Sequence, residues 1–218
     1  MFVDIDINTD LMYLFTKMKE DTTPTRRPYR MTARAEAAAE TARRILEAVV
    51  HLHSERFHDQ ITLDDIAERA GVTVQTVLRR FGSKEQLLEA AAAMVSQQVV
   101  RQRRQAPVGD VAGAVDNLLT HYEEQGRAVL RLLAQEERVP QFQPILDRGR
   151  HMHYEWVATT FRPFLDRTRD RERLHAQLIA LLDVYVWKVL RLDLGLEPSA
   201  VGTALIGMVD ALVAEETV

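Results

Sequence analysis

Hydrophobic side chains recur along most of this chain with the spacing of α-helices. Ile45, Val49 and Leu52 fall on one helical face, and similar patterns continue almost to the C-terminus. Over residues 62–83 the pattern shortens into small segments that meet at a turn around Gly71. The strict alternation typical of a half-buried strand is not found. The sequence therefore predicts an all-α protein.

Turn and breaker residues divide this pattern into four parts. We expect a flexible N-terminal arm over residues 1–35, a short three-helix domain over 36–83, a connecting helix over 84–105 and a C-terminal helical domain over 106–218. The predicted helices of the last part are 110–125, 127–137, 151–168, 171–194 and 198–216.

The segment from residue 62 to 83 has the spacing of a helix-turn-helix. A hydroxyl residue that can cap a helix N-terminus precedes each short helical pattern; these residues are Thr62, Thr73 and Ser83. Ala67 is small enough for two helices to cross closely, and Gly71 tolerates the positive φ of a sharp turn. Val77 is the apolar anchor of the second helix. The same spacing also occurs in ordinary helical hairpins. The polar residues of the second helix are therefore needed to distinguish a DNA-binding unit from such a hairpin.

When Val77 points inward, the open face of the second helix is polar. Gln can bond adenine in the major groove, Thr can contact thymine or phosphate, and Arg can bind guanine or phosphate. We expect Gln75 and Thr76 to contact bases and the two arginines to contact phosphates. The candidate DNA-binding residues are Thr62, Thr73, Gln75, Thr76, Arg79, Arg80 and Lys84.

The charge distribution supports this interpretation. The whole chain has a formal net charge of −4, which alone would disfavour a nucleic-acid partner. Residues 26–104 nevertheless contain 14 Arg and Lys against 10 Asp and Glu. The basic excess is thus confined to the segment with the predicted DNA contacts.

The run ITLDDIAERAGVTVQTVLRRFGSKEQLL, residues 61–88, resembles the DNA-binding signature of TetR-family repressors. Residues 40–57 resemble the first helix of that family. Two positions depart from the pattern: Leu78 replaces a frequent aromatic, and His58-Asp59 replaces a usual Gly. The resemblance implies a homodimer that binds a palindromic operator in double-stranded DNA. It also implies a C-terminal domain whose small-molecule effector releases the DNA.

The last predicted helices have the composition of a dimer interface. Leu178–Val189 is apolar on almost every side, as in a helix buried on more than one face. In the final helix small residues form a stripe of Ala200, Ala204, Gly207 and Ala211. Small residues allow helices to approach closely, so we expect a two-fold four-helix bundle. A thick monomer core would have the same composition.

An effector pocket is expected among the helices between the linker and this bundle. Aromatic and Met side chains suit an apolar ligand, although they equally suit a plain core. The candidate lining residues are Tyr122, Phe142, Met152, Trp156, Phe161 and Trp187. A dominant charged cluster is not found in the apolar stretches, which favours an apolar effector.

Other classes of function have little support in the sequence. Without cysteines the chain forms no disulfide and no Cys-ligated metal site, which agrees with a cytoplasmic location. We find no phosphate-binding glycine loop or nucleophile elbow and expect no enzyme activity, cofactor or membrane span. His151 and His153 diverge by about 200° on a helix, so we expect no metal site there. A ligand-independent DNA-binding or partner-binding protein is the main alternative, and it predicts a C-terminal domain without a cavity.

Overall fold

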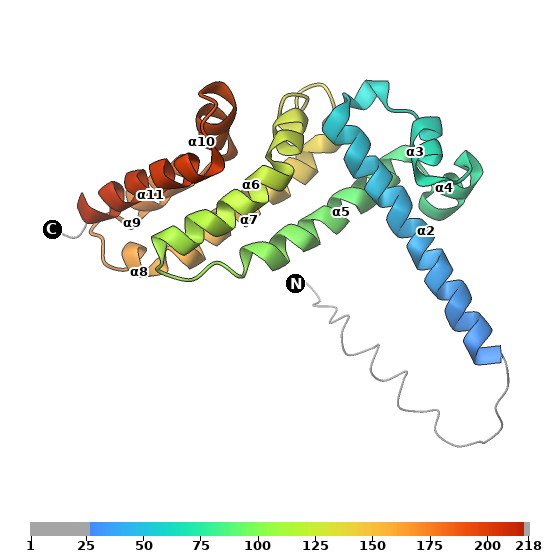
Figure 1. Ribbon diagram of the computed structural model, residues 1–218, viewed down its shortest axis with the longest axis horizontal. Helices are drawn as coiled ribbons and strands as arrows, with labels where there is room; N and C mark the ends of the chain where they lie inside the picture. Colours follow the sequence, from blue (N-terminus) through green and yellow to red (C-terminus); the bar gives the residue numbers. More distant parts are fainter. Residues whose placement is uncertain (1–26, 216–218) are drawn as a thin grey trace, which may run out of the picture. The chain divides into compact units, whose positions relative to one another are not determined.

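The computed structural model describes residues 27–215 of the chain, and every regular element in that range is helical (Figure 1). The prediction of an all-α fold is thereby confirmed. The chain divides after Glu40 into two units. Most of the expected arm over residues 1–35 lies outside the described residues. Its last part is helical, because helix α2 (Arg27–Glu55) begins at Arg27.

Long and short helices alternate along the chain. After α2 come η1 (His58–Gln60), α3 (Leu63–Ala70), α4 (Val74–Phe81) and α5 (Lys84–Arg103). The second half contains α6 (Val111–Leu133), η2 (Pro140–Phe142), α7 (Gln143–Thr160), α8 (Arg162–Leu165), α9 (Arg171–Leu181), α10 (Val184–Lys188), the π-helical turn η3 (Val189–Asp193) and α11 (Pro198–Glu215).

The first of two hydrophobic cores joins the C-terminal part of α2 to α3, α4 and the start of α5. Ile45, Ile66, Val77 and Leu87 come from these four helices and are almost completely buried. They correspond to the apolar positions that the helical periodicity selects. This small core sets the angle between α3 and α4 and so determines which face of α4 is exposed.

The second core is built around α6, which packs against α5, α10 and α11. Helices α7 and α9 also pack together, and α5 runs along α6 and α7 (Figure 1). Leu118, Leu178 and Leu205, from α6, α9 and α11, are fully buried in this core. The predicted C-terminal bundle is therefore present as a packed domain.

Several predicted helix boundaries in the bundle are wrong. Helix α6 continues through Gly126, where a break was expected. The indole ring of Trp187 occupies the space beside this glycine, so the packing requires a residue without a side chain there. The predicted helix 171–194 is instead divided into α9, α10 and η3. Its break occurs where the Asp183 carboxylate accepts a hydrogen bond of 2.9 Å from the Tyr185 backbone N–H, which starts a new helix.

The two cores are joined at the start of α7. Phe142 and Leu146 belong to the core of the short helices, although they lie far along the chain. The Gln135 side chain accepts a hydrogen bond of 2.9 Å from the His58 backbone N–H. The short helices therefore pack directly against the C-terminal domain, which provides a physical route between the two.

Candidate DNA-binding surface and ligand cavity

Side-chain caps determine where helix α3 begins. The Thr62 hydroxyl accepts a hydrogen bond of 3.1 Å from the Asp65 backbone N–H, and the Asp65 carboxylate accepts one of 2.7 Å from the Thr62 backbone N–H. This reciprocal pair is a capping box. The hydrogen bond from the Thr62 hydroxyl is the main reason that the pKa of Asp65 falls to about 2. The carboxylate is therefore ionised at neutral pH and complements the helix N-terminus.

A left-handed glycine forms the turn after α3, and a side-chain cap determines where α4 begins. Gly71 ends α3 with φ +64°, a left-handed conformation that glycine adopts without steric cost. The Thr73 hydroxyl then accepts a hydrogen bond of 3.2 Å from the Thr76 backbone N–H. These observations match the turn and caps that the sequence predicts. They hold the start of α4 at the surface.

Helix α4 presents its predicted polar face outward. Val77 is only 1% exposed and anchors the helix in the core. Gln75, Arg79 and Arg80 are exposed, and Thr76 is half-buried. The hydroxyls of Thr73 and Thr76 lie 3.0 Å apart and share a hydrogen bond that a phosphate or base could replace. The geometry thus leaves these side chains accessible for contact with a duplex.

Lys84 has partners inside the protein. Its ammonium donates hydrogen bonds of 3.2 Å to the His58 carbonyl and 2.5 Å to the Ile61 carbonyl. Partial burial also lowers the pKa of Lys84. The side chain therefore holds the turn before α3 in place. A phosphate contact at Lys84 stays a prediction, and it would have to compete with these two carbonyls.

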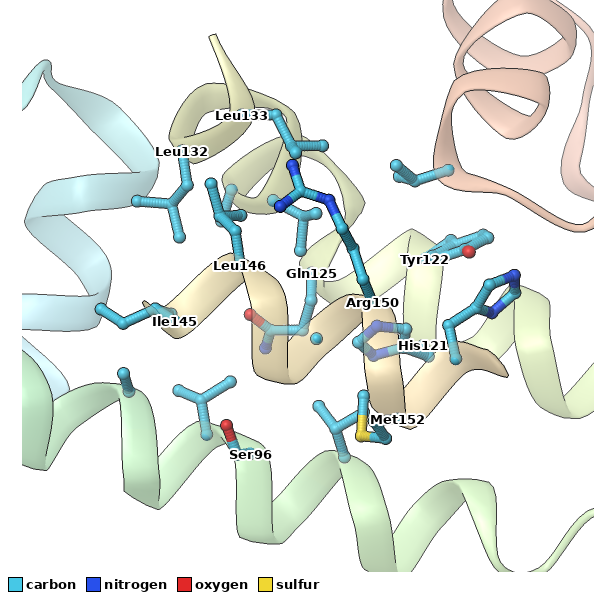
Figure 2. Close-up of a pocket in the computed structure, with 18 of the residues that line it drawn as sticks. Ser96, His121, Tyr122, Gln125, Leu132, Leu133, Ile145, Leu146, Arg150 and Met152 are labelled. Atoms are coloured by element: carbon cyan, nitrogen blue, oxygen red, sulfur yellow. The ribbon is translucent and has the colours of Figure 1, made fainter. Parts of the chain in front are cut away.

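A cavity of about 340 Å³ lies between α5, α6 and α7, and residues of α2 and of the start of α10 complete its wall (Figure 2). This volume lies within the range of small-molecule sites. Tyr122 and His121 lie at one end, and Leu132 and Ile145 lie at the other, beside α2 (Figure 2). Apolar residues form most of the wall; from α2 and α5 they are Val49, Val50, Leu88, Ala91, Ala92, Val95 and Val99.

Four polar side chains gather at the Tyr122 end of the cavity: Arg103, His121, Tyr122 and His153. Burial, and next the charge of Arg103, lowers the pKa of His121 to about 3 and that of His153 to about 4. Both imidazoles are thus neutral at pH 7. Burial raises the pKa of Tyr122 to about 12, and its hydroxyl donates a hydrogen bond of 2.9 Å to the Leu182 carbonyl. Arg103 supplies the positive charge at this end.

The charge of a second cavity arginine is already balanced. Arg150 donates hydrogen bonds to Glu136, one of them 2.8 Å long, and one of 2.9 Å to Asp147. The pair holds the pKa of the Glu136 carboxyl below its usual range. Figure 2 shows Arg150 extending from α7 toward Leu133. This part of the wall is therefore closed by an ion pair with both partners present.

Only two of the six predicted pocket residues line this cavity, Tyr122 and Met152. Trp156 lines a separate hollow between α5 and α7. The other three predicted residues do not line this cavity, because their side chains pack in the two cores; they are Phe142, Phe161 and Trp187. Aromatic character alone does not distinguish a core residue from a lining residue.

Of the polar residues at this end of the cavity, the sequence predicts Tyr122 but not Arg103, His121 or His153. His153 entered only the argument against a metal site, and Arg103 only the count of the basic segment. His151 instead forms an exposed pair with Glu155 at 3.1 Å, away from His153. Within residues 27–215 we find no group of three potential ligands that could hold a metal ion. A polar residue at a buried helical position, such as His121, was the available signal.

The segment that contains the helix-turn-helix matches a known family of domains. Residues 45–91 match the model of bacterial regulatory proteins of the tetR family. The match covers the C-terminal part of α2, all of α3 and α4, and the start of α5. Residues 45–91 are thus similar to the DNA-binding domain of the TetR family. The resemblance seen in residues 61–88 is thus confirmed, and α4 occupies the position of a DNA recognition helix.

Solved structures extend the similarity of fold to the C-terminal domain. A transcriptional regulator from Rhodococcus sp. Rha1 is 16% identical, with a TM-score of 0.66 over 81% of this chain and 98% of that one. A tetR-family regulator from Streptomyces coelicolor is 22% identical, with a TM-score of 0.60 over 79% and 82%. A candidate regulator from Saccharomonospora viridis, solved with choline, is 20% identical, with a TM-score of 0.57 over 79% and 96%. At such identities these matches indicate a common fold.

Two further comparisons are negative. Among curated protein sequences, none matches this chain. In the part of the chain that the structure describes, no helix combines the length and the apolar character required to cross a bilayer.

Proposed function

We propose that this TetR-family regulator is a cytoplasmic repressor that binds a palindromic operator as a homodimer and leaves it when a small effector binds. The observation that carries this proposal is the position of the cavity. Its wall includes Val49 and His53 of the DNA-binding domain as well as residues of the C-terminal domain. A ligand there would contact both domains. The cavity also favours effector control over the ligand-independent alternative, which predicts none.

Helix α5 is the element that would transmit the effect of the ligand. It begins at the Ser83 cap directly after α4, and it lines the cavity from Leu88 to Arg103. A small shift or tilt of α5 would therefore move the recognition helix relative to the bundle. The effector can change DNA affinity only to the extent that it binds the two arrangements differently. The choline complex of the similar Saccharomonospora viridis protein supports ligand binding in this fold.

The test of DNA binding uses fragments selected from random DNA by the purified protein. At the selected site, Gln75→Ala is expected to weaken binding by about 1–3 kcal/mol and to relax base preference, because an exposed amide on α4 can bond a base edge. Titrations on the selected site and on random DNA measure both effects.

Arg80→Gln is the matched control for this experiment. Arg80 is exposed on the same helix and is expected to contact phosphate, so its loss should weaken binding to both DNAs equally and reduce the salt dependence. Equal losses for Gln75→Ala on the two DNAs would contradict its role in base reading. A protein that selects no common sequence would contradict the repressor proposal as a whole.

The proposed dimer interface is the outer face of α11. Val201, Leu205 and Val209 on one side of this helix are buried in the second core. The stripe of small residues lies on the opposite side, where Ala200, Gly207 and Ala211 are exposed. Nearby apolar side chains are also exposed, among them Tyr185, Val189, Leu194 and Met208. A second copy would cover a helix face with this composition.

Gly207→Glu is expected to convert the dimer into a monomer of 24.9 kDa. A side chain at this position meets no atom within 4 Å in the single chain, so the variant should fold. Its charge would be buried without a partner at the dimer interface, which is strongly unfavourable. Sedimentation equilibrium measures the mass, and Ala112→Glu at an exposed position of α6 is the control. An unchanged mass for Gly207→Glu would place the interface elsewhere.

A further inference from the structure

Arg103 is a buried cation with unused hydrogen-bond donors. The residue is 4% exposed, yet within residues 27–215 no acceptor lies within hydrogen-bond distance of its Nε or Nη1. An isolated charge removed from water is strongly destabilising unless another group compensates it. Burial also lowers the pKa of the guanidinium. An arginine nevertheless remains charged at neutral pH, so the uncompensated charge is present in the empty protein.

Aromatic rings account for part of the environment of Arg103 but not for its N–H groups. The guanidinium carbon lies 4.6 Å from the ring centre of Trp156 and 5.4 Å from that of Tyr122. Such contacts attract the cation through the ring faces. They leave the N–H groups of Nε and Nη1 without acceptors. Tyr122 lines the cavity, so the cation lies at the wall of the proposed effector site.

The neighbouring polar groups do not supply an anion. His153 donates from Nε2 to the Ile179 carbonyl at 3.2 Å, so its Nδ1 is a neutral acceptor, and this atom also lacks a partner. The Tyr122 proton is used by the Leu182 carbonyl. Asp183 also lines the cavity, but its carboxylate caps α10 and forms no ion pair with Arg103. The positive charge therefore remains uncompensated at this end.

The rest of the cavity is suited to an apolar body. From the Tyr122 end the wall continues over aliphatic side chains of α5 and α6 toward the DNA-binding domain. The arginine further along, Arg150, already has Glu136 and Asp147 as partners. The cavity thus combines one free positive charge with a long apolar surface. A ligand with one negative charge would balance the first and cover the second.

We propose that the effector of this protein is a small monocarboxylic acid with an apolar body, whose carboxylate binds Arg103 and whose body extends along α5. The proposal rests on the effector-binding role assigned to the cavity above. A single carboxylate balances the single guanidinium charge, whereas a doubly charged phosphate would leave an excess negative charge in an apolar enclosure. The apolar effector expected from the sequence thereby acquires one defined polar group.

A series of three probes with the same apolar chain tests the proposal on the native protein. Calorimetry should show that octanoate binds about tenfold to a hundredfold more tightly than octanol, because only the acid gains a charge-assisted hydrogen bond. Octyltrimethylammonium should not bind, since its charge has the sign of Arg103. The proposal is overturned if octanol binds as tightly as octanoate, or if octanoate does not bind.

Substitutions then assign the preference to one side chain. Arg103→Met keeps the apolar stem and is expected to reduce the affinity for octanoate to that for octanol. Arg101→Met is the matched control, and it should leave the preference for the acid unchanged because Arg101 is exposed on the same helix and does not line the cavity. A preference that survives in Arg103→Met would overturn the assignment. The probe series on the native protein remains decisive if that variant does not fold.

Thermal unfolding distinguishes ligand binding from a purely structural role for Arg103. Removing an uncompensated buried charge should raise the Tm of the empty protein in Arg103→Met, whereas loss of a structural cation should lower it. None of these measurements uses DNA. If octanoate does not bind but the protein still binds its operator, only the proposed class of effector is overturned. Loss of specific DNA recognition with intact octanoate binding overturns the repressor proposal.

Discussion

Acidification from pH 7 to about 5 is expected to lower the free energy of unfolding by at least about 4 kcal/mol. Two histidines of the cavity wall, His121 and His153, contribute about this much, and burial of His53 and His58, which also lowers their pKa, adds to the loss. His121 and His153 are both buried, and Arg103 lies close enough to disfavour their protonation further. The effect is large compared with a typical total stability of about 5–15 kcal/mol.

The sign of this effect follows from the direction of the pKa shifts. Folding lowers the pKa of His121 from its usual 6.5 to about 3 and that of His153 to about 4. Between these values and 6.5 the unfolded chain binds protons that the folded protein does not. Stability is therefore complete above pH 6.5 and decreases as the pH falls toward the folded values. Each histidine contributes about 2 kcal/mol by pH 5.

Urea unfolding at several pH values measures this prediction. His121→Gln should reduce the loss by about 2 kcal/mol, because glutamine does not titrate. His151→Gln is the matched control, with the same chemical change at an exposed position of α7, the helix that also carries His153. A free energy of unfolding that is constant between pH 7 and 5 would contradict the neutral state assigned to the two buried imidazoles.

Gly126→Ala is expected to destabilise the protein by about 3 kcal/mol, although alanine is the better helix former. A Cβ atom at this position in α6 would lie 2.6 Å from Cζ3 and 2.8 Å from Cη2 of Trp187. The indole cannot move easily, because Trp187 is 2% exposed in the second core and its Nε1 donates a hydrogen bond of 2.9 Å to Glu123. The clash would therefore push α6 and α10 apart.

Gly149→Ala is the control for this substitution, with the same chemical change in another helix. A Cβ atom on Gly149 of α7 meets no atom within 4 Å. Only the gain in helix propensity remains, so this variant should be more stable by up to about 1 kcal/mol. Thermal unfolding of both variants gives the comparison. Equal effects of the two substitutions would show that the contact between Gly126 and Trp187 does not limit packing.

The two glycines show why some helix boundaries were predicted and others were not. Gly71 lies between two capped helices, and its role as a turn follows from its immediate neighbours. Gly126 has an equally plausible local interpretation as a break, but α6 continues through it. The reason is Trp187, which lies far along the chain and needs the space of a missing side chain. Local sequence contains no information about such a contact.

The sequence by itself determined the DNA-binding half of the fold. The cap of α3 joins residues three positions apart, Thr62 and Asp65, and the turn at Gly71 depends on the conformation of one residue. Such interactions join residues that are close in sequence, so their pattern can be predicted from the sequence. The exposed face of α4 then follows from helical periodicity, with Val77 turned inward.

Only the tertiary structure decided the character of the cavity. Its wall combines side chains from five helices, and their positions depend on how these helices cross and pack. Trp187 is a core residue, although the sequence suggested it for the pocket wall, and His121 lines the cavity, although it was not among the predicted lining residues. The charge of Arg103 became significant only when folding removed it from water without providing an acceptor. Whether a side chain is buried and whether it finds a hydrogen-bond partner depend on residues far away in the sequence, so tertiary packing determines both.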